Sequence, residues 1–338
     1  MNIVHVGLGK TGTSSLQKHV FSTLKAKGLV DTYNDERWYH AITEHRYIAH
    51  RPEAQSLAKF FHDDEGLHFI SKESLLTWNP AHWQEDCDYL QTMFGAQSTI
   101  LLTLRSPKSY LRSVYQQRVH EGHIIPAEHF FLCSKRYEET APYARTRLGG
   151  IFNCDALHYQ ALVDLLAARF EKVVVVSIDG VNDLSFMQKL LELTPEQLAS
   201  LQEQFTKHRC ANKSYSEVAM RLTFARERFL KALGLKSCSS LDLALCSSSK
   251  DDSLSHIWFK DLSPIQKLRV LPKRALTWRR FMQSIVSKYI AQKPYLLPEG
   301  IYLGQHLEAN TAFYDALRSE QSGYRVYTHS ASEQRDRA

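Results

Sequence analysis

The chain has 338 residues, of which 43% are hydrophobic and 23% charged, and its formal net charge is +6. These values are typical of a globular protein with a sizeable core, and they exclude a disordered chain and a dedicated nucleic-acid binder. No stretch approaches the roughly 20 apolar residues of a membrane span. The first residues lack the basic leader and long apolar run of a signal peptide, so we expect a cytoplasmic protein.

The cysteine pattern indicates free thiols in a reducing compartment. The six cysteines form no Cys-x-x-Cys pair, and no histidine spacing completes a set of metal ligands. They are Cys87, Cys133, Cys154, Cys210, Cys238 and Cys246. The sequence therefore predicts neither a disulfide scaffold nor a zinc site.

Short apolar runs alternate with helical patterns along the first two thirds of the chain. This alternation predicts βα units and a mostly parallel sheet. The predicted strands are Asn2–Val6, His68–Ile70, Ser98–Leu104 and Lys172–Ile178. The predicted helices run from Thr13 to about Lys27, from Lys108 to about Glu121, from Ala156 to Phe170 and from Ser216 to Leu233. The strands are apolar on both faces, so we expect helices on both sides of the sheet.

The composition changes near residue 235. We expect a core over 1–235, an extension packed on it over 236–328, and a disordered tail over 329–338. The extension begins with a serine-rich loop and continues as a basic helical segment, 260–293. That segment is either a solvated helical face or a peripheral contact with an anionic surface, such as the inner face of the membrane.

The first predicted strand runs into a turn rich in glycine and hydroxyl groups. The turn reads Gly7-Leu8-Gly9-Lys10-Thr11-Gly12-Thr13-Ser14-Ser15. Backbone N–H groups at the start of the following helix form an anion site. The spacing also satisfies Gly-x-Gly-x-x-Gly with Asp31 about 20 residues on, which fits a dinucleotide fold. However, Lys10 and the surrounding hydroxyls favour a cradle for a terminal phosphate or sulfate. The Walker A spacing is absent.

A second motif follows the strand Ser98–Leu104. Arg105 comes at the carboxyl end of that strand, where open α/β sheets bind ligands. Pro107 can begin the next helix, and Ser113 lies about two turns into it. A guanidinium and a hydroxyl would then converge on one phosphate.

Together these two motifs resemble those of the sulfotransferases that use 3′-phosphoadenylyl sulfate (PAPS), and they are closest to the bacterial, carbohydrate-type members. Residues 9–17 resemble the loop that binds the 5′-phosphosulfate, and residues 104–115 resemble the motif that binds the 3′-phosphate. The resemblance covers roughly 1–233. It implies a P-loop-like, three-layer α/β fold, with a central, mostly parallel sheet flanked by helices and a C-terminal helical extension.

The resemblance also implies how the donor is held. Arg105 and Ser113 would bind the 3′-phosphate, PAP would be the product, and no metal would be required. The residues implied for the 5′-phosphosulfate are Gly9, Lys10, Thr11, Gly12, Thr13, Ser14 and Ser15. The C-terminal Arg-Lys-Gly clamp of the animal cytosolic branch is absent, so the contacts to the adenine are not assigned.

Sulfuryl transfer needs charge stabilisation on the leaving phosphate and help in deprotonating the acceptor. Lys10 is the predicted cation for the leaving group. By resemblance, Glu73 in Ser71-Lys72-Glu73 is the predicted base, with Lys72 as a helper. His120 and His123 are the alternatives, because a histidine needs less tuning near neutral pH. Glu73 could also simply charge a helix start.

The sequence leaves the acceptor and two other function classes open. We expect a hydroxyl of a carbohydrate or glycolipid as the acceptor. The first alternative is a P-loop-like kinase or phosphotransferase, for which Asp179 is the best candidate ligand of magnesium. The second is a non-catalytic nucleotide-binding protein with the same fold.

Overall fold

The computed structural model describes residues 1–8, 13–39, 41–42, 52–146, 150–208, 215–234, 282–290, 292–320 and 322–328. The chain divides into two compact units. The first takes its described residues from Met1–Tyr110, Leu132–Ala211 and Tyr302–Ala338, and the second from Leu111–Phe131 and Asn212–Ile301. The division cuts one helix, α7 (Pro107–His120), and the two-residue strand β5 (Phe131–Leu132), of which only Leu132 belongs to the first unit.

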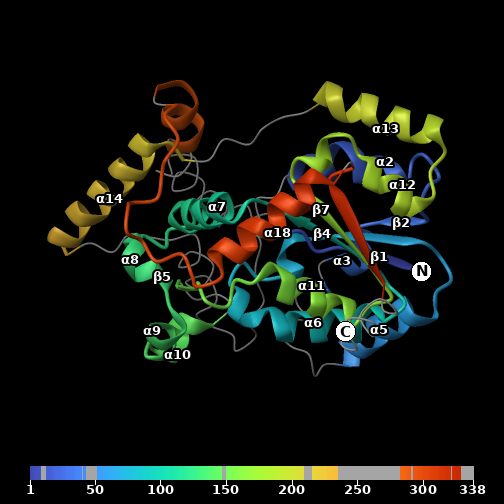
Figure 1. Cartoon of the computed structure of the whole chain (residues 1–338), viewed down its shortest axis with the longest axis horizontal. Helices are drawn as coiled ribbons and strands as arrows, with labels where there is room; N and C mark the ends of the chain where they lie inside the picture. The colour runs from blue at the N-terminus through green and yellow to red at the C-terminus, as the bar shows by residue number, and fades with distance from the viewer. Residues whose placement is uncertain are drawn as a thin grey trace, which may run out of the picture. The chain divides into compact units, whose positions relative to one another are not determined.

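The first unit is built on a six-stranded sheet with the order β2-β3-β1-β4-β7-β8 (Figure 1). The strands are β1 (Asn2–His5), β2 (Thr32–Tyr33), β3 (His68–Ser71), β4 (Thr99–Leu104), β7 (Lys172–Ser177) and β8 (Tyr324–Thr328). All neighbouring strands are parallel except β8, which runs antiparallel to β7. The four strands predicted from the sequence are confirmed, and the mostly parallel sheet is confirmed with them. β2 and β8 were not predicted.

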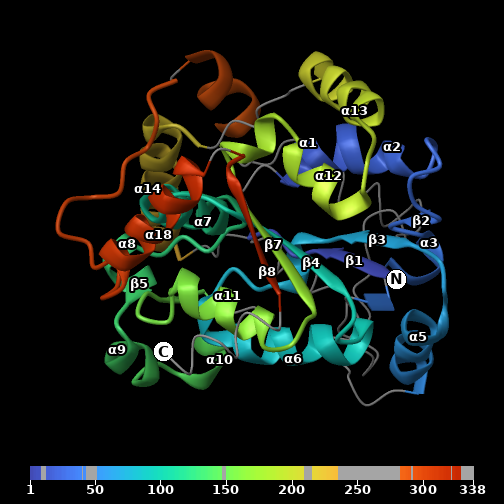
Figure 2. The ribbon, with the colours of Figure 1, turned by 45° about the vertical axis from the view of Figure 1, so that its right-hand side comes forward.

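One face of the sheet is covered by helices that begin directly after β1 and β7. A helical run comprises α1 (Thr13–Leu16), a π-helical turn η1 (Gln17–Phe21) and α2 (Ser22–Leu24). With α12 (Ser185–Leu191) and α13 (Pro195–His208) it forms a layer that Figure 2 shows on one side of the strands. Val174 and Val176 of β7 face this layer and belong to one hydrophobic cluster with Phe21 and Phe186. Alternate residues of a strand point to opposite faces, so Val173 and Val175 supply the other face.

The opposite face of the sheet is covered by α5 (Pro52–Asp63), α6 (Trp83–Phe94) and α11 (Tyr159–Ala167), as Figures 1 and 2 show. The helix α11 begins later than the sequence predicts. Asn310 of α18 (Leu307–Ser319) is buried, its Oδ1 accepts from the N–H of Tyr159, and its Nδ2 donates to the carbonyl of Leu157. These bonds hold the residues before Tyr159 outside the helix.

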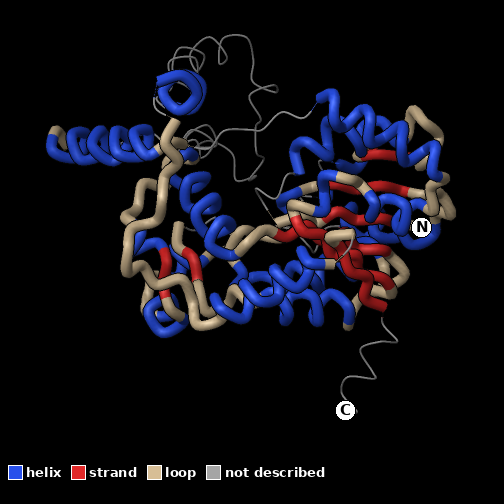
Figure 3. The backbone as a smooth tube through the Cα atoms, turned by 45° about the horizontal axis from the view of Figure 1, so that its top comes forward, coloured by secondary structure: helices blue, strands red, loops and turns tan. Residues whose placement is uncertain are grey.

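The edge strand β8 is held against β7 by a close backbone approach. The N–H and the Oγ of Ser177 both donate to the carbonyl of Gly323. A Cβ on Gly180 would lie 2.4 Å from that same carbonyl oxygen, so a larger residue would push the two segments apart. The last segment of the chain therefore completes the sheet, which Figure 3 shows as a row of adjacent strands.

Shorter elements complete the first unit and connect its strands. They are α3 (Glu36–Tyr39), η2 (Glu73–Leu75), η3 (Pro80–His82), β5 (Phe131–Leu132), α9 (Ser134–Glu138), α10 (Pro142–Arg145), β6 (Phe152–Asn153) and η4 (Gly180–Asn182). β5 and β6 form a separate two-stranded sheet. Asn79 is fully buried there, and its Nδ2 donates to Tyr137 Oη and to the carbonyl of Ile151.

The second unit contains most of α7, the short α8 (Ala127–Phe130), α14 (Glu217–Ala232) and η6 (Met282–Ile290), which is π-helical. Ser216 caps α14, because its Oγ accepts from the N–H of Ala219 at 3.3 Å. The N–H of Ser216 in turn donates to Ser287 Oγ of η6 at 3.0 Å. The predicted helices over α7 and α14 are confirmed.

Several predictions fall on residues outside those that the structure describes. They are the serine-rich loop after 236, most of the basic segment 260–293 and the tail 329–338. Among the helices of the described ranges, none is both long and apolar enough to cross a membrane. The cysteines that the structure describes, Cys87, Cys133 and Cys154, are free thiols.

Candidate functional site

The strand order identifies the carboxyl edge of the sheet as the place where a ligand would be expected. β1 lies between β3 and β4, and the chain leaves β1 towards β2 on one side. After β4 the chain goes to β7 on the other side. Connections that leave two adjacent parallel strands in opposite directions open a crevice outside their carboxyl ends. The segments that follow β1, β3 and β4, which carry the predicted site residues, all meet at this carboxyl edge.

The loop after β1 is only partly described. Gly9, Lys10, Thr11 and Gly12 lie outside the described residues. At the start of the loop, a Cβ on Gly7 would lie 2.2 Å from Thr103 Oγ1, 2.7 Å from Thr13 Cγ2 and 2.8 Å from His5 Nε2. The loop must therefore leave β1 at a residue without a side chain, because β4 and the start of α1 pack directly against it.

The structure brings two of the predicted site residues into contact. Thr13, the first residue of α1, is buried, and its Oγ1 donates a hydrogen bond to Glu73 Oε1. Glu73 opens the short helix η2 directly after β3. Ser14 and Ser15 occupy the same first turn as Thr13 and are half-buried. The helix start and the proposed base thus belong to one cluster, although they are separated by 60 positions in the chain.

Lys72 and Tyr39 lie beside this cluster. Lys72 Nζ donates to the carbonyl of Tyr39 and lies 4.0 Å from the centroid of its ring. Burial raises the pKa of the Tyr39 phenol, and the negative charge of Glu73 raises it further. The predicted helper lysine is thereby held by α3 next to the proposed base.

A buried polar network fixes β3 under the site. Ser71 Oγ lies 2.7 Å from His5 Nδ1 and accepts from Gln17 Nε2 at 3.1 Å. The backbone of Ser71 also exchanges two hydrogen bonds with the side chain of Asn34, which follows β2. Three strands and η1 are therefore tied together immediately behind Glu73. No motif in the sequence indicates this network, because its members are far apart in the chain.

His5 stays neutral in this network. Complete burial lowers its pKa to about 3, since no water solvates the charged imidazolium there. Its second ring nitrogen lies 3.4 Å from Thr103 Oγ1. A neutral imidazole can donate at one nitrogen and accept at the other, which suits a position between two hydroxyl groups.

Arg105 follows β4 directly, as the sequence predicts, and is half-buried. Its carbonyl accepts a hydrogen bond from Tyr159 Oη at 2.8 Å. Burial raises the pKa of both Tyr159 and Tyr314, while the positive charge of Arg105 works in the opposite direction on both phenols. The guanidinium is thus near two tyrosines from α11 and α18. No signal in the sequence indicated that Tyr314 belongs beside Arg105.

Ser113 and His120 both lie on α7, in the part that belongs to the second unit. Ser113 is buried at 3% exposure. The imidazole ring of His120 meets the ring of Tyr215 edge-on, with 5.0 Å between the centroids. His123 follows the helix and is half-buried. The choice of base between Glu73 and His120 therefore stays a proposal.

The remaining candidate acids occupy other places. Asp31 precedes β2 and accepts from the N–H of Leu67 at 2.6 Å, at the amino edge of the sheet. A ribose-binding acid of a dinucleotide fold would follow the second strand instead. Asp179 follows β7 and accepts from Tyr314 Oη at 3.3 Å. Within the described ranges, no group of three or more His, Cys, Asp or Glu residues is arranged to hold a metal ion.

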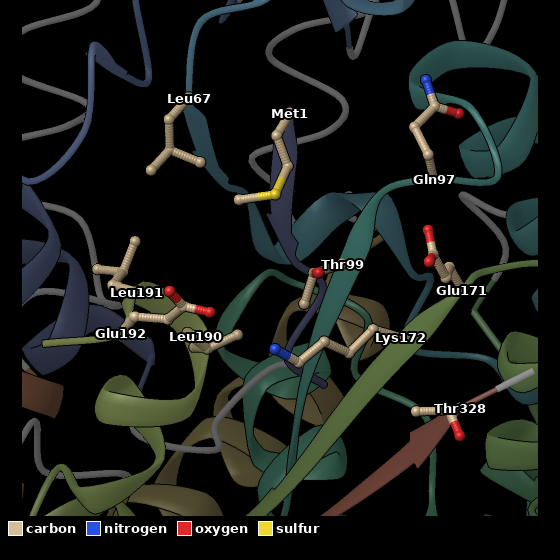
Figure 4. A pocket seen from close by; sticks show the side chains of 10 residues that line it. All are labelled: Met1, Leu67, Gln97, Thr99, Glu171, Lys172, Leu190, Leu191, Glu192 and Thr328. Carbon is tan, nitrogen blue, oxygen red and sulfur yellow. The ribbon is translucent and has the colours of Figure 1, made fainter.

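The opposite, amino edge of the sheet carries a hollow of about 820 Å³ (Figure 4). It is lined by Met1, Leu67, Gln97, Thr99, Glu171, Lys172, Leu190, Leu191, Glu192 and Thr328. Lys172 Nζ donates to the carbonyl of Lys189 at 2.7 Å and so caps the last turn of α12. Its lining combines the charged side chains of Glu171, Lys172 and Glu192 with apolar ones such as Leu190 and Leu191.

Comparison of the chain with models of protein families, with curated proteins and with solved structures found no match. The functional interpretation therefore depends on the site itself.

Proposed function

We propose that this protein is a sulfotransferase that moves the sulfuryl group of PAPS to a hydroxyl acceptor, and that its P-loop-like carboxyl edge is the donor site. The observation that carries the proposal is the hydrogen bond from Thr13 to Glu73. It joins the start of the helix that follows β1 to an acid that follows β3, and Arg105 follows β4, the neighbour of β1 on its other side. An anion site, a carboxylate and a guanidinium are the groups that this transfer requires.

The donor fits the groups that the carboxyl edge presents. The helix start at Thr13 offers backbone N–H groups and the positive end of a helix dipole to the 5′-phosphosulfate. Ser14 and Ser15 add hydroxyls, and Gly9, Lys10, Thr11 and Gly12 complete the proposed loop. Arg105 would pair with the 3′-phosphate, and a charge-assisted hydrogen bond of this kind is about twice as strong as a neutral one. Ser113 is proposed as its partner from α7.

Glu73 would take the proton from the acceptor hydroxyl as that oxygen forms its bond to sulfur. The hydrogen bond from Thr13 fixes the position of the Glu73 carboxylate at the start of the first helix. Lys10 would stabilise the negative charge on the leaving phosphate. His120 is the alternative base. No metal ion has a role in this scheme.

A kinase of the same fold is the competing proposal, and one observation disfavours it. Its candidate magnesium ligand, Asp179, follows β7, which is separated from β1 by β4. Asp179 also accepts a hydrogen bond from Tyr314. A ligand for magnesium at the phosphates would instead come from a strand next to the loop. A non-catalytic nucleotide binder remains the third class.

The acceptor that we propose is a carbohydrate or glycolipid hydroxyl, and the proposed location is the cytoplasm or the inner face of the membrane. Free thiols at Cys87, Cys133 and Cys154 support a reducing compartment. The structure assigns no residue to the acceptor.

Titration calorimetry of the full chain with PAP, ATP and NAD tests the proposal. We expect PAP to bind in the absence of magnesium, and ATP and NAD to bind at least tenfold more weakly. Transfer of labelled sulfate from PAPS to lysate glycans should follow. A preference for ATP with magnesium would favour the kinase instead, and the absence of binding by any of the three would contradict both enzymes.

A further inference from the structure

The helix α14 buries one of its faces inside the second unit. Ala219, Met220 and Thr223 are buried on this face. α14 packs against η6, where Met282 and Val286 are buried as well. This side of the helix therefore contributes to the core of the second unit.

The other face of α14 exposes large apolar side chains. Val218 is 39% exposed, Leu222 41%, Phe229 64% and, just after the helix, Leu233 56%. At 3.6 residues per turn these four positions lie within about 60° of one another around the helix axis. We call them the α14 stripe. Of the buried residues, Met220 and Thr223 point about 140° and about 80° away from its nearest member, while the small Ala219 lies about 40° from its edge.

An exposed stripe of this length is costly unless something covers it. Large contiguous apolar patches on a protein surface usually mark an interaction site. The neighbouring element η6 adds exposed apolar groups at Ile285, Tyr289 and Ile290. Most of the large apolar side chains that the described residues expose thus lie on α14, directly after it, or on η6.

Positive charges accompany the stripe. Arg221 and Arg228 lie along one side of it and Arg226 along the other, by the same helical geometry. Arg221 is 79% exposed, and its distance of 3.8 Å to Glu217 is that of a weak, solvated ion pair. Four basic residues of α14 face only two acidic ones, Glu217 and Glu227.

We propose that the α14 stripe docks onto an anionic lipid bilayer. An amphipathic helix of this kind lies in the plane of the interface, with its apolar side at the boundary of headgroups and acyl chains and its arginines against lipid phosphates. A second copy of the chain fits less well, because a two-fold contact would place the same arginines of both copies around one patch. This inference does not depend on the donor chemistry. It depends on α14, Leu233 and η6, and not on residues 260–281 of the basic segment.

Vesicle co-sedimentation of the full chain tests the inference. The wild type should bind vesicles of phosphatidylcholine with phosphatidylserine, bind phosphatidylcholine alone at least tenfold more weakly, and lose affinity as salt rises. Leu222→Glu combined with Phe229→Glu should weaken binding more than tenfold. Arg221→Gln and Arg228→Gln should each weaken it about fivefold.

Two control variants separate the stripe from general surface effects. Tyr143→Glu removes a ring that is 79% exposed in the first unit, and Lys207→Gln removes an exposed charge of α13. Both should bind like the wild type. Equal binding of the Leu222/Phe229 variant and the wild type would overturn the proposal.

Sedimentation velocity and thermal melting test two alternatives to the bilayer, a second copy of the chain and packing of the stripe within the chain itself. A wild-type dimer that the Leu222/Phe229 variant disperses, with no vesicle binding, would assign the stripe to a second copy. A melting temperature lowered by several degrees, with vesicle binding unchanged, would assign it to packing within the chain. Either result would replace the bilayer.

Discussion

The two edges of the central sheet differ in how their polar groups are arranged. At the carboxyl edge, Thr13 and Glu73 meet through a hydrogen bond, and Arg105 ends the adjacent β4. At the amino edge there is a hollow of about 820 Å³, in which Lys172 already donates to the carbonyl of Lys189. The carboxyl edge is the stronger candidate for catalysis, because contact between chemically active groups matters more than volume.

Helix dipoles explain why the edges differ. In parallel βα units the helices begin at the carboxyl edge and end at the amino edge, so the first attracts anions and the second attracts cations. The helical run from Thr13 starts at the carboxyl edge. At the amino edge, Lys172 donates to the end of α12 and occupies the cation position with a residue of the chain itself. An anionic ligand would therefore be favoured at the carboxyl edge.

The same substitution at the two edges should give the largest contrast in rate. Glu73→Gln should lower kcat for sulfate transfer by about 100-fold or more, the usual contribution of a general base, with PAP affinity retained. Glu192→Gln at the hollow should leave kcat unchanged. Steady-state kinetics and PAP titration measure both. A Glu73→Gln protein that keeps most of its rate would remove this residue from the base role and leave His120 to be tested.

Replacing two glycines with alanine, one at each edge of the sheet, should destabilise the protein by different amounts. Gly7→Ala should lower the free energy of unfolding by about 3 kcal/mol, because the added Cβ overpacks three buried side chains. Gly66→Ala, before β3, should cost about 1 kcal/mol or less, because its nearest neighbour is the end of the partly exposed Asp64 side chain and not a packed core group. Urea denaturation compares them. Equal losses would mean that the start of the loop tolerates a side chain.

Acid should destabilise the carboxyl-edge network through His5. Burial lowers its pKa from 6.5 to about 3, so between these values the unfolded chain binds a proton that the folded chain does not. Stability is then lost as the pH falls below 6.5, by about 2 kcal/mol at pH 5 relative to pH 8. Urea denaturation at both pH values should show this loss in the wild type and a smaller one in His5→Gln. If the free energy of unfolding falls equally from pH 8 to pH 5 in the two proteins, His5 does not have this role.

Replacing one threonine hydroxyl with a methyl group at each edge should give the smallest difference in kcat. Thr13→Val deletes the donor to Glu73 and should lower kcat about fivefold, the value of one hydrogen bond of about 1 kcal/mol. Thr99→Val changes a buried threonine that lines the hollow and should leave kcat unchanged. If both variants keep full activity, the bond between Thr13 and Glu73 has no role in the reaction.

The sequence predicted the local parts of this architecture well. β4 and β7 are nearly continuous apolar runs, and β1 and β3 each have two adjacent apolar residues at their centre, so these strands are recognisable from consecutive residues. β8 could not be found this way, since Tyr324–Thr328 is largely exposed at a sheet edge and lacks such a run. Its place depends on the close approach of Gly323 to Gly180, which are 143 positions apart by their numbers.

The same distinction holds for the site. The motifs located Arg105 at the end of β4, because a strand end follows directly from the apolar run before it. The contact of Thr13 with Glu73 depends on the parallel register of β1 with β3, which pairs His5 with Ser71. Tyr314 reaches the surroundings of Arg105 only because α18 packs against β7. No local pattern encodes these long-range pairings.

Binding of PAP to matched variants of the two edges tests the central claim most directly. If the carboxyl edge is the donor site, Arg105→Ala should weaken PAP binding about 10- to 100-fold, as expected for the loss of charge-assisted hydrogen bonds to a phosphate. Lys172→Ala, at the hollow, should change the affinity less than about twofold. Calorimetry that finds the affinity of Arg105→Ala unchanged, or that of Lys172→Ala reduced instead, would contradict the assignment of the donor to the carboxyl edge.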